Sequence, residues 1–111
     1  MSKYGNRKIH HNGMVFDSKK EYVRYLELQV LQKNNLISDL RRQVDYELIP
    51  KKVDADGRCL ERAIKYRADF VYYDNELKQE VVEDVKGMKT PDYIIKRKLL
   101  LYTKGIRILE I

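Results

Sequence analysis

The chain has 111 residues, and 23 Lys and Arg against 17 Asp and Glu give it a formal charge of +6. This length suits one domain over residues 1–111 and excludes two domains of ordinary size. No apolar stretch approaches the roughly 18 residues of a membrane span, and no secretory signal opens the chain, so we expect a cytoplasmic protein. A single cysteine excludes an intramolecular disulfide and a multi-cysteine zinc site.

The basic residues are concentrated near the two ends of the chain. Residues 1–20, which open with a basic arm at 1–8, contain five basic residues and one acidic residue. Residues 86–107 contain seven basic residues and one acidic residue, whereas residues 21–85 are acidic on balance. Such charges form solvated faces in most small proteins. A surface that binds phosphates around an acidic centre is the alternative.

A small hairpin and a helix are predicted first along the chain. Residues 9–16 contain Asn12-Gly13, a dipeptide that supplies the positive φ angles of a tight turn. Ser18 and Glu21 have the spacing of a capping box, so a helix should span 19–34. Its apolar residues fall on two sides, so we expect both sides to be covered. One side has Tyr22, Val23, Leu26 and Val30, and the other has Tyr25 and Leu28, which flank Glu21.

Strands are predicted for the middle of the chain. Alternation over 44–49 and β-branched and aromatic residues over 63–73 and 81–85 indicate three strands. Residues 54–57 form a turn, and residues 74–78 form the loop of a hairpin between the second and third strands.

The end of the chain is predicted to add a helix and a last strand. Thr90-Pro91 supplies an N-cap and an N1 proline for a helix to about residue 103. Gly105 then ends this helix in a left-handed conformation, and residues 106–111 form a short strand. The whole order predicts an α/β fold, with a mixed sheet flanked by helices and a small N-terminal hairpin.

Two aspartates and a lysine meet in the predicted hairpin of the second and third strands. A symmetric loop centred between residues 76 and 77 places Asp69 opposite Asp84, with Lys86 on the same face. Cross-strand partners have Cβ atoms only about 5 Å apart, so the two carboxylates would repel each other without a cation. Hard oxygen ligands suit Mg²⁺, with Mn²⁺ as a substitute. Lys86 could position or deprotonate water and hold a phosphate oxygen, whereas Glu83 should face the other way.

These residues resemble a known nuclease motif. Asp69, then fourteen intervening residues, then Asp84-Val85-Lys86 is similar to the D…(D/E)-X-K motif of the PD-(D/E)XK nuclease superfamily. The predicted order of elements resembles the restriction-endonuclease-like αβββαβ core of that superfamily. Many members add a metal-binding glutamate on the first helix, and Glu21 occupies the matching position. Ala68 stands where the motif has proline, and Asp84 stands where glutamate is commoner.

Three further stretches resemble a family of small phage-encoded proteins placed near Holliday-junction resolvases and transposon endonuclease subunits. They are residues 3–6, 16–21 and 82–87. The resemblance implies a metal-dependent endonuclease that acts on branched DNA or recombination intermediates, in the host cytoplasm if phage-encoded. It implies metal ligation by Asp69, Asp84, the Val85 backbone carbonyl and Glu21, directly or through water. Lys86 would position the attacking water.

The expected DNA-binding residues neutralise backbone phosphates without reading the bases. They are Lys3, Arg7, Lys8, Lys19, Lys20, Lys89, Lys96 and Arg97. One domain of this size reaches only one strand at a time, so cutting two strands predicts a homodimer.

Other interpretations of the same residues remain open. Glu21 has a structural explanation as a helix cap. Asp69 could pair with Arg67, or Asp84 with Lys86, in an ion pair that has no catalytic role. The whole protein could be a DNA-binding accessory protein that does not cut, or a sequence-specific nicking or transposition endonuclease subunit.

Overall fold

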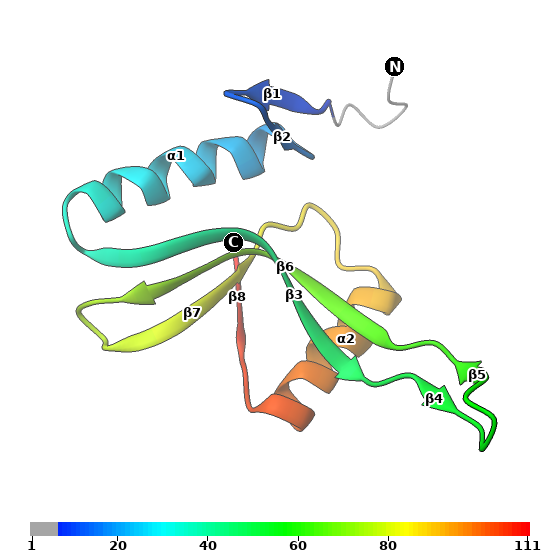
Figure 1. Cartoon of the computed structure of the whole chain (residues 1–111). Coiled ribbons are helices and arrows are strands. Elements are labelled where there is room, and N and C mark those ends of the chain that lie inside the picture. Colours follow the sequence, from blue (N-terminus) through cyan, green and yellow to red (C-terminus); the bar gives the residue numbers. More distant parts are fainter. Residues whose placement is uncertain (1–6) are drawn as a thin grey trace.

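A computed structural model describes residues 7–111 (Figure 1), so Lys3 and most of the basic arm lie outside the described residues. In chain order its elements are β1 (Ile9–His11), β2 (Met14–Phe16), α1 (Lys19–Lys33), β3 (Ile37–Ile49), β4 (Lys52–Val53), β5 (Cys59–Glu61), β6 (Ile64–Asp74), β7 (Gln79–Asp84), α2 (Pro91–Lys104) and β8 (Ile108–Glu110). Over this described range, neither helix has the length and apolar character needed to cross a membrane.

A four-stranded mixed sheet in the order β3-β6-β7-β8 forms the centre of the molecule. β3, β6 and β7 pair antiparallel, whereas β8 pairs parallel to β7. A parallel neighbour requires a crossover connection, and α2 is that connection. α1 lies on one side of the sheet, next to the β1–β2 hairpin, and α2 lies on the other (Figure 1). The predicted mixed α/β fold with an N-terminal hairpin is therefore confirmed.

Local signals set the ends of these elements as predicted. Asn12 and Gly13 both have positive φ, at 49° and 77°, which a tight turn between antiparallel strands requires. The Ser18 hydroxyl accepts a hydrogen bond from the Glu21 backbone N–H at 3.1 Å and so caps α1. Thr90 caps α2 in the same way, and the left-handed residue after α2 is a glycine.

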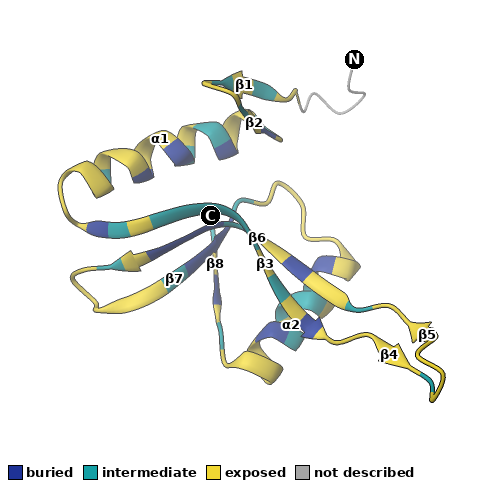
Figure 2. Cartoon of the chain, viewed as in Figure 1, coloured by how far each residue is buried: buried dark blue, intermediate teal, exposed yellow. Residues whose placement is uncertain are grey.

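The core is divided between the two faces of the sheet (Figure 2). Under α2, the buried residues are Leu48, Tyr66, Ala68, Val71, Val82, Tyr93, Leu100 and Ile108. Under α1 and β2, they are Phe16, Tyr25, Leu28, Ile37, Phe70 and Tyr72. β6 contributes to both clusters, so its two faces are covered by different helices.

The prediction that α1 is covered on two sides is wrong. Tyr25 and Leu28 pack into the core on the side of Glu21. On the other side, Val23, Leu26 and Val30 are 43%, 37% and 58% exposed. The sheet covers only one side of the helix.

The first strand of the sheet is longer than predicted. β3 begins at Ile37, seven residues before the predicted strand, and Asp39 and Gln43 within it have positive φ. Such backbone is unusual away from glycine and breaks the alternation from which strands are predicted. Beyond the sheet, β4 and β5 form a further two-stranded hairpin around the predicted turn and project from the body of the molecule (Figure 1).

Candidate metal and phosphodiester site

β6 and β7 bring Asp69 and Asp84 together at one end of the sheet. Phe70 pairs with Glu83 at this end of the two strands, and Asp69 and Asp84 are the next residue of each strand. The backbone N–H of Val85 donates a hydrogen bond of 2.7 Å to the Asp69 carboxylate. Two acids with fourteen residues between them in the chain therefore share one site.

Asp84 is held on one carboxylate oxygen only. The residue is 1% exposed, and its Oδ2 accepts a hydrogen bond from the Tyr66 hydroxyl at 2.5 Å. Its Oδ1 is buried and has no hydrogen-bond partner among residues 7–111, and Lys86 Nζ lies 3.8 Å away. Burial raises the pKa of Asp84, against the lowering effects of Tyr66 and Lys86. A buried carboxylate oxygen without a donor is costly and favours a nearby cation.

The pKa of Asp69 is raised by burial and by neighbouring charges. Burial raises its pKa to about 7, and the hydrogen bond from Val85 opposes the rise. The charges of Asp84 and Glu21 raise the same pKa, and the charge of Lys86 lowers it. The three acids therefore interact electrostatically, and ionising all of them leaves negative charge that the protein does not fully compensate.

Glu21 is buried on α1, at 3% exposure, but its carboxylate faces other partners. It accepts hydrogen bonds from the Asp17 backbone N–H at 3.4 Å and from the Gln43 amide at 3.1 Å. The Arg42 guanidinium lies 3.6 Å from it. The carboxylate therefore binds the backbone just before α1 and also contacts β3. The structure does not bring Glu21 into direct contact with the aspartate pair.

Glu83 faces away from Asp84, as predicted. It is fully buried under α1, where Arg24 donates hydrogen bonds of 2.8 and 2.6 Å to its two oxygens. The Tyr72 hydroxyl donates to the same carboxylate. The alternative ion pair of Asp69 with Arg67 is wrong, because Arg67 binds Asp45 at 2.8 Å.

The donors of this site fit a divalent cation held by two carboxylates. Mg²⁺ is commonly held by one or two carboxylates and keeps several waters, and Oδ1 of Asp84, which has only the Lys86 ammonium 3.8 Å away, offers an oxygen to it. The Val85 carbonyl remains a predicted third ligand. Over residues 7–111, no three His, Cys, Asp or Glu side chains gather closely enough to hold a metal ion. Glu21 would therefore act through water.

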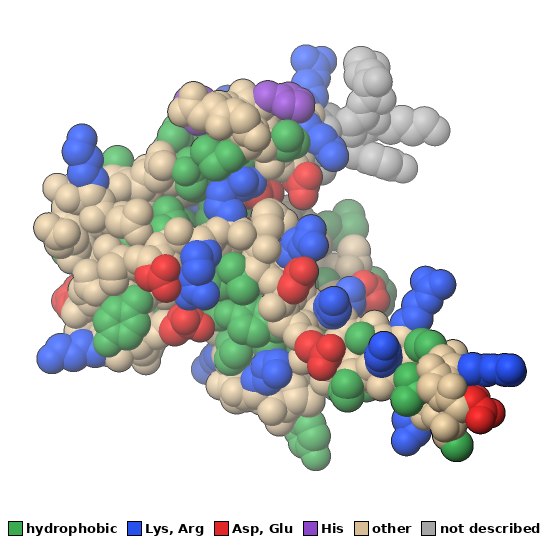
Figure 3. Space-filling view, in the orientation of Figure 1, with side chains coloured by type: hydrophobic (Ala, Val, Ile, Leu, Met, Phe, Trp, Pro, Cys, Tyr) green, Lys and Arg blue, Asp and Glu red, His purple; other side chains and the backbone are tan. Residues whose placement is uncertain are grey.

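The residues predicted to bind DNA have different surroundings. Arg7, Lys8 and Lys19 are exposed and have no acidic partner among the described residues. Lys20 donates to the Ile111 carbonyl at 2.9 Å, and Lys96 pairs with Asp92. Lys89 and Arg97 both bind Glu110, each at 3.1 Å. On the face shown in Figure 3, Lys and Arg side chains are spread over the surface rather than gathered in one patch.

Sequence reasoning missed Tyr66, Tyr93 and Glu110 as parts of the site. Tyr66 orients Asp84, and the Tyr93 ring lies 5.1 Å from Lys86 Nζ. The Tyr93 hydroxyl donates to Glu110 at 2.7 Å. Only the spacing of Tyr93 and Arg97 by one helical turn could have indicated this cluster, because Glu110 comes from β8 at the far end of the chain.

The fold and site define a small α/β protein with an aspartate pair and a lysine at the end of a mixed sheet. The chain belongs to the family described as protein of unknown function (DUF1064), whose model matches residues 1–107. No curated protein and no solved structure matches the chain. The case for a function therefore depends on the site itself.

Proposed function

We propose that this protein is a Mg²⁺-dependent DNA endonuclease of the PD-(D/E)XK type that acts on branched DNA or recombination intermediates. The order α1, β3, β6, β7, α2, β8 is the order expected of the restriction-endonuclease-like αβββαβ core. The observation that supports this proposal most strongly is the convergence of Asp69, Asp84 and Lys86, with one buried oxygen of Asp84 left without a donor.

The residues of the chain have distinct parts in the proposed hydrolysis. Asp69 and Asp84 would hold Mg²⁺, which when bound polarises the phosphodiester and stabilises the developing negative charge. Tyr66 fixes Asp84 by its hydrogen bond. Lys86, exposed beside Asp84, would orient the attacking water and a phosphate oxygen. The water oxygen bonds to phosphorus, the bond from phosphorus to the leaving sugar oxygen breaks, and that oxygen takes a proton.

DNA and a second copy of the chain are the proposed partners. Arg7, Lys8 and Lys19 are free to neutralise phosphates, which would give affinity that falls with salt. Four other cations would exchange their present contacts for phosphates: Lys20, Lys89, Lys96 and Arg97. A homodimer would present two sites to two strands, and sedimentation at several concentrations measures that state.

Calorimetry with Mn²⁺ tests the proposed metal ligands without requiring cleavage. Wild type should bind Mn²⁺, and Asp84→Asn should lose most of the affinity because one ligand charge is removed. Glu80→Gln is the matched control, because Glu80 is an exposed acid on the same strand that pairs with Arg41. Equal binding by all three proteins would remove the metal site from the proposal.

Substrate preference is tested with a four-way junction and a linear duplex of the same sequence. A resolvase-like enzyme should cut the junction faster, whereas a sequence-specific nicking or transposition subunit should cut both equally at one sequence. Lys86→Ala serves as the inactive control in each reaction.

A DNA-binding accessory protein is the second candidate, and the placement of Glu21 favours it. Arg42 and Gln43 hold Glu21 away from the aspartate pair, so the described residues lack a third direct carboxylate ligand. Such a protein would shift DNA in a gel and leave it uncut in both Mg²⁺ and Mn²⁺.

A further inference from the structure

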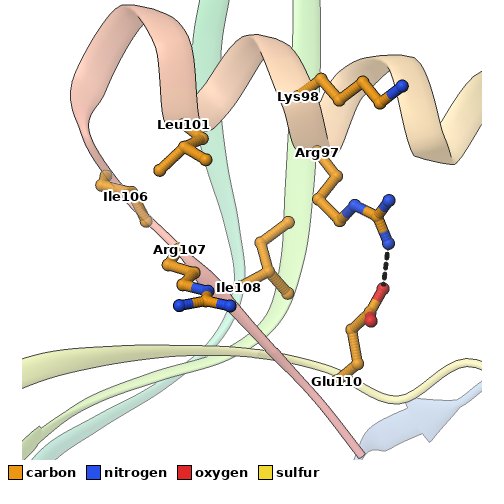
Figure 4. Close-up of a pocket in the computed structure, with 7 residues that line it drawn as sticks. All are labelled: Arg97, Lys98, Leu101, Ile106, Arg107, Ile108 and Glu110. Carbon is orange, nitrogen blue, oxygen red and sulfur yellow. Dashed lines mark hydrogen bonds and ion pairs between the residues drawn. The ribbon is translucent and has the colours of Figure 1, made fainter.

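A groove of about 350 Å³ lies between α2 and the segment that leads into β8 (Figure 4). Apolar side chains of Leu101, Ile106 and Ile108 line part of it. Arg97 enters from the helix and Arg107 from the opposite, strand side. A volume of this size suits one small organic group rather than a single ion.

The lining of this groove has an excess of positive charge. Three cations, Arg97, Lys98 and Arg107, line it together with one carboxylate, Glu110. Glu110 is already compensated, because hydrogen bonds from Tyr93, Lys89 and Arg97 lower its pKa to about 2. No acid among residues 7–111 lies within ion-pair distance of Lys98 or Arg107. Two cations at the groove are therefore free to meet an anion.

The groove is connected to the aspartate pair by a short series of contacts. Lys86, beside Asp84, lies over the Tyr93 ring, and the Tyr93 hydroxyl donates to Glu110. The same Glu110 oxygen binds Arg97 at the groove, at 3.1 Å. Asp84, Tyr93 and Glu110 are linked on the side of the sheet that α2 covers, so the groove and the aspartate pair share one network of contacts within the protein.

We propose that the α2–β8 groove binds a phosphate, with its sugar, of the nucleic acid strand that enters the aspartate site. Guanidinium groups match phosphate oxygens in paired hydrogen bonds, and Arg107 offers such a group, with Lys98 as the second cation that has no acidic partner among residues 7–111. The apolar lining covers the sugar, which carries no charge. The identity of the anion as part of a DNA strand rests on the proposed nuclease function, whereas phosphate binding at the groove does not.

Two measurements test the groove, and neither requires cleavage. Inorganic phosphate should shift the backbone amide resonances of residues 106–108 in wild type and in Asp84→Asn. The double variant Arg107→Ala/Lys98→Ala should lose those shifts. A 5′-phosphorylated oligonucleotide should bind the double variant several-fold more weakly, with a salt slope reduced by about 1 for each lost phosphate contact.

Lys33→Ala is the matched control, since Lys33 is an exposed lysine at the end of α1. It should bind phosphate and oligonucleotide nearly as wild type does. If the double variant binds both probes as tightly as Lys33→Ala, or if wild type shows no phosphate shift at residues 106–108, the groove is not a phosphate site. Phosphate binding without any DNA cleavage by wild type would contradict the nuclease proposal and leave the groove as an anion site.

Discussion

Asp69→Asn should change how the stability of the protein depends on pH. The pKa of Asp69 lies near 7 in the folded protein and near 3.8 in the unfolded chain. Its contribution to stability is therefore fully present below about pH 3.8 and is lost as the pH rises to about 7. A pKa difference of this size corresponds to at most about 4 kcal/mol. Asp69 is partly exposed to solvent, so we expect the free energy of unfolding to fall by about 2 kcal/mol over this pH range.

Asparagine is a suitable replacement because its amide oxygen can still accept the hydrogen bond from Val85. Urea unfolding between pH 5 and pH 8 should show wild type losing stability relative to Asp69→Asn as the pH rises. Asp45→Asn is the control: its exposed carboxyl binds Arg67, which lowers its pKa, so it stays ionised over this range. Parallel curves for wild type and Asp69→Asn would refute the view that burial, together with the charges of Asp84 and Glu21, disfavours the ionised Asp69 carboxylate.

Two further substitutions test contacts around the site. Arg24→Ala leaves the fully buried Glu83 without a cation and should cost about 3–5 kcal/mol of unfolding free energy. Arg41→Ala, which removes exposed ion pairs with Asp39 and Glu80, should cost about 0–1 kcal/mol, and equal losses would contradict this account. Tyr66→Phe removes the hydrogen bond from the Tyr66 hydroxyl to Asp84 and should cost about 1–3 kcal/mol, measured by urea unfolding. An unchanged stability would mean that Asp84 does not depend on Tyr66.

The aspartate pair could be predicted from the sequence because its geometry depends on local features. The hairpin between β6 and β7 closes symmetrically, so the residue numbers fix which positions face each other. The caps of α1 and α2 are also local, since each depends on side chains within one turn. Predictions of this kind need no knowledge of distant contacts.

Other parts of the molecule depend on distant contacts and could not be predicted in this way. α1 has apolar residues on two sides, and only the position of the sheet decides that Tyr25 is buried while Val30 is exposed. Arg24 reaches a glutamate 59 positions away in sequence. Glu110 joins the site because β8 pairs in parallel with β7, which the sequence of either strand does not reveal.

Nicking of supercoiled plasmid in the presence and absence of Mg²⁺ tests the central claim most directly. Wild type should nick the plasmid only when Mg²⁺ is present. Glu80→Gln, which replaces an exposed acid on β7, should behave in the same way. Asp84→Asn and Lys86→Ala should fold and bind DNA but fail to nick it, because they remove a metal ligand and the group that positions water. Either of two results would contradict the proposed nuclease site. In one, wild type binds plasmid but stays inactive in Mg²⁺ and Mn²⁺; in the other, Asp84→Asn nicks at the wild-type rate.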